Sequence, residues 1–362
     1  MTTPLPIALD AMGGDTMPEA AVDGALRAAR DGHGVVLVGD EVRLRALLAE
    51  RGGDLSVEHA PDVITMDEHA TDVRRRKGAS VMVAMRLVKE GRASAAVSMG
   101  HSGATMASAL LVLGRLPGVE RPAILANIPT AKGGYAALLD AGANADCRPS
   151  FLRQFALMGS IYARAVHGID DPSVGLMSIG EEPEKGNELT RETHELLART
   201  PGIRFHGNVE GGDLLLGTTD VVVTDGFTGN VVLKLAEGEA RVIFGLVRDA
   251  LRSSLRASLG GILAKPALRA VAARLDPAEV GAQPLLGVDG YAFIGHGSSD
   301  ARAVASAIRT ASKMVEARVA ERIATELAKL QAPAPGASRV PAAAAADDVS
   351  DRPNVRARRD GV

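Results

Sequence analysis

The stretch "IALDAMGGD", residues 7–15, predicts a buried strand that ends in a tight, polar turn. Its apolar residues are typical of a strand, and the pair Gly13-Gly14 favours a turn. Two acids, Asp10 and Asp15, flank that turn. Glycine-rich turns at strand ends often hold phosphate, which paired acids would repel. We therefore expect both acids to accept hydrogen bonds from loop amides, or from a basic side chain, and so to fix the loop.

A helix is expected to follow this turn. Thr16 and Glu19 have the spacing of a capping box, and Pro18 suits a first helical turn. The helix would run from about residue 18 to residue 30, with Asp15 or Thr16 capping its free amides. A plain strand–turn–helix connection without chemistry would explain Asp15 alone.

Short apolar runs that end in glycine and polar residues recur along the chain, separated by longer segments with helical periodicity. This alternation predicts a three-layer α/β/α fold with a mostly parallel sheet, because parallel strands need helical crossovers that cover both faces. In such sheets, ligands bind beyond the carboxyl ends of the strands. The runs are 6–15, 34–40, 95–103, 123–129, 173–182 and 220–230.

The composition limits the class of protein. The 362 residues can bury a sizeable core, which must be aliphatic because the chain has six Phe, three Tyr and no Trp. A formal net charge of −3 argues against a general polyanion binder, so no nucleic-acid partner is expected. The single cysteine, Cys147, excludes an intrachain disulfide framework and fits a reducing cytosol. Without a secretion signal, a membrane-length apolar run or a zinc-type cluster, we expect a cytoplasmic protein with no metal and no cofactor.

Residues 240–275 combine aliphatic residues at helical spacing with seven basic residues and one acid. They predict a protruding helical hairpin that is broken at Gly260-Gly261 and Pro266. Such a basic and apolar surface suits an anionic membrane. A helix pair in a dimer interface, with solvated basic residues, explains the same pattern, and both uses can coexist at the tip of a dimer. The residues expected to contact the membrane or a partner are Leu255, Leu259, Ile262 and Leu263.

The end of the chain divides into two parts. Apolar residues recur on one side of residues 300–330, which predicts a single closing helix. Residues 331–362 are rich in Ala and Pro and then mixed in charge, so they cannot build a core and are expected to be disordered. Residues 1–330, with the hairpin, would form the α/β domain.

Several widespread motifs are absent. No G-x-G-x-x-G follows a predicted strand, no Gly-Lys dipeptide supports a P-loop, and no G-x-S-x-G nucleophile elbow occurs. Three polar loops remain as candidates: "SMGHSGAT" (98–105), "EEPEKGNEL" (181–189) and "TDGFTGNVVLK" (224–234). Small residues at helix N-termini can form a backbone-amide nest for an anion. The loops carry Gly100, His101, Ser102, Gly103, Lys185, Asn187, Asp225, Thr228, Gly229 and Asn230.

These loops, in this order, resemble those of the phosphate acyltransferase family of bacterial phospholipid synthesis. The resemblance runs from "IALDAMGGD" to "HGSSDA" (296–301) and so covers most of the chain. The matches between them are "LLDAGANADC" (138–147), "QFALMGSIYA" (154–163), "SIGEEPEKGNEL" (178–189), "GNVEG" (207–211) and "TDGFTGNVVLK". One loop departs from the family pattern, because it reads "GHSG" at 100–103 where "GNTG" is expected. His101 can still donate a hydrogen bond, so its expected binding role is kept.

The resemblance implies a reversible reaction that moves a long-chain fatty acyl group from acyl carrier protein to inorganic phosphate. The product, acyl phosphate, would serve phospholipid synthesis and pass to a membrane glycerol-3-phosphate acyltransferase. The resemblance also implies a homodimer with the fold of phosphotransacetylase and of isocitrate and isopropylmalate dehydrogenases. A cytoplasmic enzyme attached peripherally to the inner face of the cell membrane would fit this role. The arginines of 240–275 could instead steer the acidic carrier protein.

Phosphate is already a nucleophile at neutral pH, so such a site must hold the dianion against a thioester and stabilise the oxyanion. Lys185 is the candidate for the positive charge, and Asn230 is the candidate donor to the carbonyl oxygen. Asn187, with the amides near Thr228 and Gly229, would complete the phosphate cradle. A surface salt bridge to a neighbouring glutamate is the alternative explanation of Lys185.

Other polar residues are expected to fix the loops. His296 could line the site, although a capped helix start at Ser298 explains it equally well. Cys147 could accept the acyl group in a two-step mechanism, but no activating histidine pair accompanies it, so direct attack by phosphate is expected. The residues given a loop-fixing role are Asp10, Asp15, Asn144, Asp225 and His296.

Three other functions compete with this interpretation. An acyl-CoA-dependent phosphotransacetylase would not need a basic, apolar hairpin. A dehydrogenase of the related fold would need a nucleotide site and usually a metal site. A non-enzymatic membrane adaptor on the same fold would bind vesicles without turnover.

Overall fold

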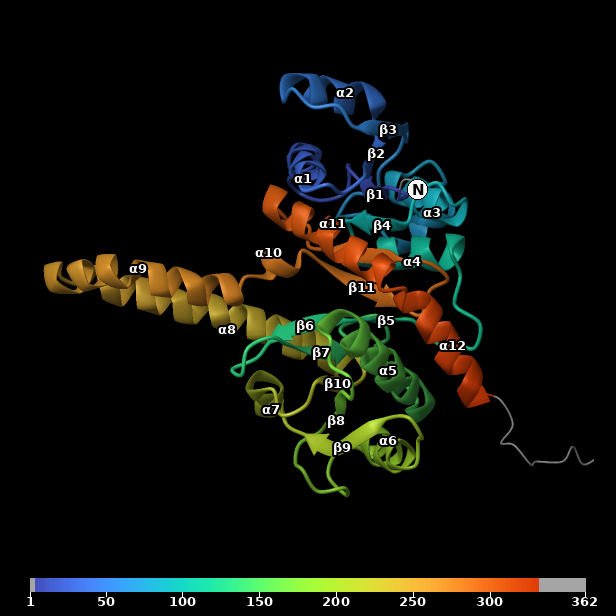
Figure 1. The fold of residues 1–362 in the computed structure, drawn as a ribbon, viewed down its shortest axis with the longest axis vertical. Coiled ribbons are helices and arrows are strands. Elements are labelled where there is room, and N and C mark those ends of the chain that lie inside the picture. Colours follow the sequence, from blue (N-terminus) through green and yellow to red (C-terminus); the bar gives the residue numbers. More distant parts are fainter. Residues whose placement is uncertain (1–3, 332–362) are drawn as a thin grey trace, which may run out of the picture.

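The computed structural model describes residues 4–331 and contains two mostly parallel sheets (Figure 1). The sequence predicted disorder for residues 331–362. Gln331 is the last residue of α12, and the others lie outside the described residues. Figure 1 shows the first sheet in the upper half of the molecule and the second in the lower half. A long pair of helices projects to one side between them.

Seven strands form the first sheet, in the order β3-β2-β1-β4-β12-β11-β5. Neighbours are parallel from β3 to β12, whereas β11 runs antiparallel to both β12 and β5. The strands predicted within 6–15, 34–40 and 95–103 are β1, β2 and β4. The bounds are β1 Ile7–Asp10, β2 Val35–Gly39, β3 Ser56–His59, β4 Ala95–Ser98, β5 Ala123–Ile124, β11 Ala282–Leu286 and β12 Ala292–Gly295.

Five strands form the second sheet, in the order β6-β7-β10-β8-β9. Only β6 is antiparallel to its neighbour. The runs predicted at 123–129, 173–182 and 220–230 supply β5 with β6, β8 and β10. The bounds are β6 Ala126–Pro129, β7 Tyr135–Leu139, β8 Ser173–Met177, β9 Arg204–Val209 and β10 Val221–Val223.

Helices cover both faces of the sheets. Ile7 and Leu9 belong to a core with residues of α1 and α11, whereas Ala8 belongs to a second core with residues of α3 and α4. Because successive strand residues face opposite sides, these helices lie on opposite faces of the sheet. The three-layer α/β/α prediction is confirmed. The covering helices are α1 Glu19–Arg30, α2 Glu41–Glu50, α3 Ser80–Lys89, α4 Ser102–Val112, α5 Pro149–Tyr162, α6 Glu188–Ala198, α7 Gly211–Leu216, α11 Ala301–Glu316 and α12 Val319–Gln331.

Short elements complete the chain. A 3₁₀ turn and a π-helical turn accompany α3 and α5, and a one-turn helix leads into β11. Their bounds are Ala70–Arg74, Ala163–His167 and, for α10, Pro277–Val280.

The protruding hairpin consists of α8, Gly226–Arg252, and α9, Leu255–Arg274 (Figure 1). Its predicted break was wrong. The chain turns at Ser253 and Ser254, where the Ser254 hydroxyl accepts a hydrogen bond from the Ala257 amide and caps α9. Gly260, Gly261 and Pro266 lie inside α9. A Cβ at Gly261 would lie 3.4 Å from Leu251, so this glycine belongs to the contact between the two helices.

Two further helix predictions need correction. The predicted capping box does not form, because α1 has no side-chain cap and the Thr16 hydroxyl donates to the Ser299 carbonyl at 2.6 Å. The predicted closing helix is interrupted between α11 and α12. Arg318, between the two helices, has φ +53°, which is outside the helical range. Two residues later, the Ala320 amide donates to the Tyr291 hydroxyl. That tertiary bond replaces one bond of a continuous helix.

Candidate functional site

Three loops meet at the carboxyl edge of the first sheet, after β1, β4 and β12. The strands are in register there, with Ser98 paired to both Asp10 and Ile294. One Asp10 carboxylate oxygen accepts from the amides of Met12 and Gly13 at 3.2 Å. The other accepts from the Ser98 hydroxyl at 2.7 Å. Asp10 thus makes the contacts expected of a residue that fixes this loop.

Ser98 is a buried residue that sequence reasoning missed. Its hydroxyl donates to Asp10 and also accepts from the Gly100 amide at 3.1 Å. A Cβ at Gly100 would lie 3.2 Å from the Cα of Gly13, so the two loops pack backbone to backbone. The signal in the sequence was a serine at a strand end, which is too common to single out.

His101 caps α4. Its Nδ1 accepts from the Ala104 amide at 3.3 Å, so the neutral ring carries its proton on Nε2. A Cβ at Gly103 would lie 3.1 Å from the imidazole, so this glycine leaves room for the ring. Ser102 is exposed in the first turn of α4. The loop therefore offers Nε2 as a donor at a helix N-terminus.

Asp15 and His296 are both exposed beside this edge. The Asp15 amide donates to the Gly297 carbonyl at 2.8 Å, but its carboxylate caps no helix, so its predicted capping role was wrong. His296 Nδ1 lies 2.8 Å from the Ser298 hydroxyl. The helix expected to start at Ser298 begins later, because Asp300 caps α11 through the amides of Arg302 and Ala303.

A second group of loops follows β7, β8 and β10 of the second sheet. Its centre is Asp140, a buried carboxylate that sequence reasoning did not single out although it stands in "LLDAGANADC". Burial raises the pKa of Asp140, whereas hydrogen bonds from the surrounding loop oppose that rise. The donors to Asp140 are the amides of Ile124, Gly142, Ala143 and Asn144 and the side chain of Asn144.

Asn144 connects that loop to its surroundings, as a loop-fixing residue should. Its side-chain nitrogen donates to Asp140 and to the Pro122 carbonyl, both at 2.8 Å. Its own carbonyl accepts from the Gly226 amide at 2.7 Å. The loop after β7 is therefore packed against the first turn of α8.

Asp225 caps α8, and this changes the expected cradle. Its carboxylate accepts from the amide and the hydroxyl of Thr228, both at 2.8 Å. The Gly229 amide donates to the Asp225 carbonyl. The amides of Thr228 and Gly229, expected to hold phosphate, are thus already used to start the helix. The predicted cradle cannot include them in this arrangement.

Asn230 follows in the same helix and is exposed. A Cβ at Gly142 would lie 3.6 Å from the Asn230 side chain, so Asn230 stands over the loop that Asp140 organises. Within residues 4–331, its side-chain amide has no hydrogen-bond partner. It is therefore available to a ligand.

Lys185 lies in the loop after β8 and is exposed. Its aliphatic stem covers Gly180, where a Cβ would lie 3.0 Å from the lysine Cγ. In the part of the chain that the structure describes, no glutamate pairs with its ammonium group. Asn187 caps α6 through its side-chain oxygen, which accepts from the amide and the hydroxyl of Thr190. The side-chain NH₂ group of Asn187 is left to donate.

The two groups of loops are connected through β5. Ile124 pairs with β11 of the first sheet, and its amide donates to Asp140 of the second group. No hydrogen bond within 4–331 joins Lys185 to Asn230 or either of them to His101. That these side chains share one pocket stays a prediction.

Cys147 is poorly suited to nucleophilic catalysis. Burial raises the pKa of its thiol to about 12, and nearby acids add to the rise. The sulfur lies 3.6 Å from the Asn144 carbonyl. A thiol with this pKa is almost entirely protonated at neutral pH.

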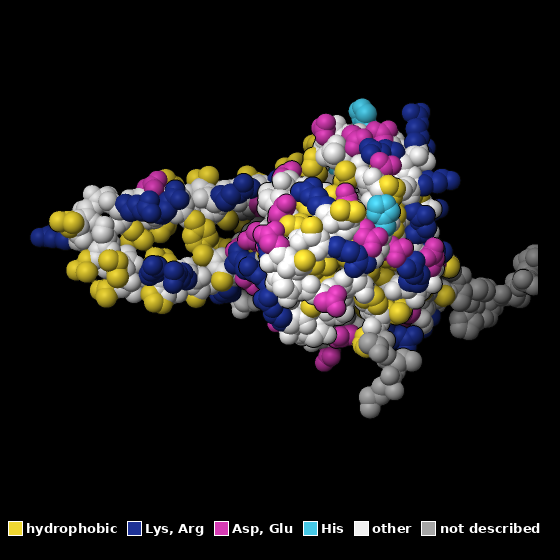
Figure 2. Space-filling view, turned by 90° about the horizontal axis from the view of Figure 1, so that it is seen from above, with side chains coloured by type: hydrophobic (Ala, Val, Ile, Leu, Met, Phe, Trp, Pro, Cys, Tyr) yellow, Lys and Arg dark blue, Asp and Glu magenta, His cyan; other side chains and the backbone are white. Residues whose placement is uncertain are grey.

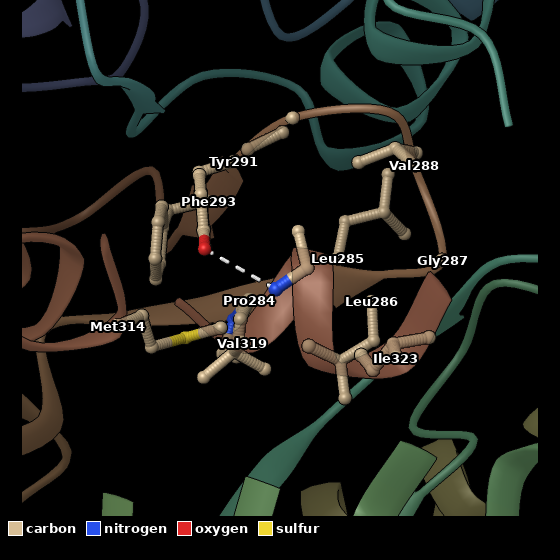
Figure 3. Close-up of a pocket in the computed structure, with 13 residues that line it drawn as sticks. Pro284, Leu285, Leu286, Gly287, Val288, Tyr291, Phe293, Met314, Val319 and Ile323 are labelled. Atoms are coloured by element: carbon tan, nitrogen blue, oxygen red, sulfur yellow. Dashed lines mark hydrogen bonds between the residues drawn. The ribbon is translucent and has the colours of Figure 1, made fainter. Parts of the chain in front are cut away.

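A small void between β11, β12 and α12 is not a substrate site. Its volume is about 10 Å³, which is room for one water at most. Figure 3 shows Leu285, Leu286, Val319 and Ile323 around it, so its walls are apolar. In the described residues, no cluster of acidic, histidine or cysteine side chains could hold a metal ion. None of the described helices is long and apolar enough to cross a membrane.

Comparison with known proteins places the chain in a family. A family described as "Fatty acid synthesis protein" matches residues 5–322. A phosphate acyltransferase of Thermus thermophilus is 61% identical over 324 residues, which cover 90% of this chain and 99% of the relative. A phosphate acyltransferase of Deinococcus radiodurans is 59% identical over 279 residues, which cover 75% of this chain and 77% of the relative. The chain belongs to the phosphate acyltransferase family.

Solved structures outside this family share its fold. A phosphotransacetylase from Streptococcus pyogenes matches with a TM-score of 0.58 at 17% identity, covering 86% of this chain and 94% of the other. A branched-chain phosphotransacylase from Enterococcus faecalis matches with a TM-score of 0.55 at 14% identity, covering 86% and 99%. The expected likeness of this phosphate acyltransferase family member to phosphotransacetylases is confirmed at the level of fold.

Proposed function

We propose that this protein transfers a long-chain fatty acyl group from acyl carrier protein to inorganic phosphate and forms acyl phosphate for phospholipid synthesis. Family membership supports acyl transfer to phosphate. The observation that carries the proposal to a site is a pair of polar side chains, Lys185 and Asn230, that have no hydrogen-bond partner within residues 4–331. Lys185 lies in the loop after β8, and Asn230 lies in the second turn of α8, which follows the neighbouring parallel strand β10. Ligands of such sheets bind at this edge.

The reaction needs positioning and charge stabilisation rather than a strong base. A phosphate oxygen attacks the thioester carbonyl carbon, and the carbon–sulfur bond then breaks. The electron pair leaves on sulfur, and the resulting thiolate of the carrier takes up a proton from solvent. Lys185 holds the phosphate, and the Asn230 amide donates to the carbonyl oxygen as negative charge develops there.

Other side chains would complete this site. The NH₂ group of Asn187 is left free by its capping bond, so it can donate to phosphate. The His101 Nε2 proton and the α4 N-terminus offer an anion contact at the edge of the first sheet. Asp10, Asp140 and Asn144 hold the loops in place without touching the anion.

The hairpin supports the proposed attachment to the inner face of the cell membrane. Near its tip, Leu255 is 92% exposed and Leu263 is 77% exposed, with Leu259 and Ile262 beside them. Basic and apolar side chains are both spread over the projecting part of the hairpin (Figure 2). Acyl phosphate is amphiphilic, so a membrane contact would favour its delivery to a membrane glycerol-3-phosphate acyltransferase.

The base of the same hairpin supports the proposed homodimer. Apolar residues recur every four residues along α8, and a second copy of the chain would cover them. They are Phe227, Val231 and Leu235, all more than half exposed. The tip would then remain free for the membrane.

The test is phosphate-dependent consumption of long-chain acyl–acyl carrier protein, with the product trapped by hydroxylamine as the hydroxamate. The proposal predicts that enzyme and phosphate together release free carrier protein and hydroxamate in equal amounts. A control without phosphate measures the direct reaction of hydroxylamine with the thioester, and the enzyme should add nothing to it. Acyl-CoA is the comparison donor. Turnover with acyl-CoA alone would indicate a phosphotransacetylase, and turnover with neither donor would favour a membrane adaptor.

A further inference from the structure

A hollow of about 600 Å³ lies beside the second group of loops, between the segment before β5 and the start of α5. Three arginines line it: Arg115, Arg121 and Arg148. The rest of its wall comes from two acids, Glu120 and Asp146, and from Cys147 and Phe151. Its volume is within the range of small-molecule and cofactor sites, about 300–1,000 Å³.

The three guanidinium groups are exposed and lack carboxylate partners in the described part of the chain. Arg115 donates to the backbone carbonyl of Glu120, and the Arg121 guanidinium lies over the Phe151 ring at 5.9 Å. Arginines elsewhere, such as Arg76 and Arg92, form ion pairs with two acids each. Charge is therefore left unbalanced at the hollow.

The charges limit the ligand. Three arginines and two acids leave a formal charge of plus one, and one of the acids, Glu120, already accepts from the Ser150 hydroxyl at 3.1 Å. A single phosphodiester, with one negative charge, would balance this charge, and guanidinium groups bind phosphate oxygens in a fork geometry. The remaining acid and the ring of Phe151 suit the amides and methylenes of a linear chain.

The hollow is connected to the proposed reaction site by one loop. Residues 140–148 contain Asp140 at one end and Arg148 at the other. Gly142 of this loop lies under Asn230, and the Cys147 thiol lies against the Asn144 carbonyl. The chain takes five residue-to-residue steps from 142 to 147, so these two positions are at most about 18 Å apart. A donor whose thioester and phosphate are joined by a long flexible chain could occupy both places at once.

We propose that this hollow binds the phosphate and adjoining amide chain of a phosphopantetheine arm, and so positions its thioester at Asn230. This inference rests on the proposed acyl transfer. Carrier protein and CoA both contain such an arm, so either could supply it. The three arginines are then determinants of donor affinity rather than catalytic residues.

The test compares Arg148→Gln and Arg121→Gln with the wild type and with Arg30→Gln. Arg30 is an exposed arginine in the last turn of α1, on the upper part of the molecule away from α5 (Figure 1). Steady-state constants are measured with acyl–acyl carrier protein, acyl-CoA and acyl-pantetheine, which lacks the phosphate. Direct binding of 4′-phosphopantetheine and of pantetheine is measured by calorimetry.

We expect Arg148→Gln and Arg121→Gln to raise KM for both phosphorylated donors by about tenfold, the factor for one charge-assisted hydrogen bond. The kcat of these two variants should stay within twofold of wild type with every donor. Their KM for acyl-pantetheine should also stay within twofold. Arg30→Gln should match wild type within twofold in kcat and KM for all three donors. Equal losses with acyl-pantetheine would overturn the assignment. So would a loss confined to carrier protein, because it would assign the arginines to the protein part of the donor.

The binding measurement separates this inference from the proposed function. If the wild type turns over no donor, the acyl-transfer proposal fails. Preferential binding of 4′-phosphopantetheine over pantetheine, lost in Arg148→Gln, would still support the hollow as its site. No preference in the wild type would overturn the hollow even if turnover is observed.

Discussion

Asp10 and Asp140 occupy corresponding places in the two sheets. Each follows the apolar residues of an interior strand, β1 or β7, and each accepts hydrogen bonds from the amides of the loop that comes next. The sequence around both begins with Leu-Asp-Ala. A carboxylate at such a place satisfies several buried donors at once, which leaves the neighbouring loop residues in fixed positions.

The Cys147 thiol gives a prediction at this scale. Burial raises its pKa from 9.0 to about 12, so the thiolate fraction at pH 8 is roughly a thousandfold lower than for an unperturbed thiol. We expect iodoacetamide to label the native protein at least a hundredfold more slowly than the unfolded chain, and the rate to rise with pH. We also expect Cys147→Ser to keep its acyl-transfer activity within about threefold. Fast labelling, together with an inactive but folded serine variant, would favour an acyl-cysteine intermediate.

Single residues were predicted unevenly from the sequence. Strand-end loops were located correctly because glycine and polar residues after an apolar run are a local signal. The capping role of Thr16 was wrong because its hydroxyl bonds to Ser299, which is 283 residues away in the chain. Asp140 was missed because its donors include Ile124, a residue on a different strand. Such contacts depend on tertiary structure, which a local pattern does not contain.

At the scale of elements, the start of α8 is constrained by close packing. A Cβ at Gly229 would lie 1.9 Å from the Asp140 carbonyl oxygen, so even a methyl group cannot fit there without movement of the backbone. Gly238 is in the same helix, and no atom lies within 4 Å of its added Cβ. The two glycines form a matched pair for an experiment.

We expect Gly229→Ala to lower the free energy of unfolding by about 3 kcal/mol or more, since overpacking displaces the loop of Asp140. Gly238→Ala should leave it unchanged or raise it by up to about 1 kcal/mol, because alanine favours the helix. Urea denaturation of both variants measures the difference. Equal stability of the two variants would show that α8 is not held against this loop as described.

The hairpin illustrates what the sequence could and could not predict about elements. Its basic and apolar pattern was recognised, and the element projects from the molecule as expected (Figure 1). The position of its turn was predicted wrongly. Gly260-Gly261 was expected to be the turn, whereas the chain turns before Ser254, whose hydroxyl caps α9. A glycine pair marks either a turn or a close helix contact, and only the packing against Leu251 decides between them.

At the scale of the whole molecule, α8 links the proposed reaction site to the proposed membrane contact. It starts at the residues beside Asp140 and ends next to the hairpin tip. Its 27 residues make it about 40 Å long. A tip on the membrane surface would therefore keep the site at a fixed distance from the lipid.

The membrane contact can be tested with a matched exposed residue. We expect Leu255→Glu with Leu263→Glu to weaken binding to phosphatidylglycerol vesicles at least tenfold, since two buried leucines would be lost. Val42→Glu should have no effect, because Val42 is 81% exposed on α2 and far from the hairpin. Vesicle sedimentation measures both. Unchanged binding of the double variant would assign the tip to another use, such as a contact with a second copy.

The most direct measurement for the central claim is phosphate-dependent release of carrier protein by wild type, Lys185→Ala and Asn230→Ala, with Lys313→Ala as the exposed-lysine control. We predict that Asn230→Ala lowers kcat by about 10²–10³, as for loss of an oxyanion donor, and that Lys185→Ala lowers kcat/KM by a similar factor. Both variants should keep the wild-type circular dichroism and melting temperature, and Lys313→Ala should match wild type. Normal release by folded Lys185→Ala and Asn230→Ala would contradict the account and place the chemistry on other residues.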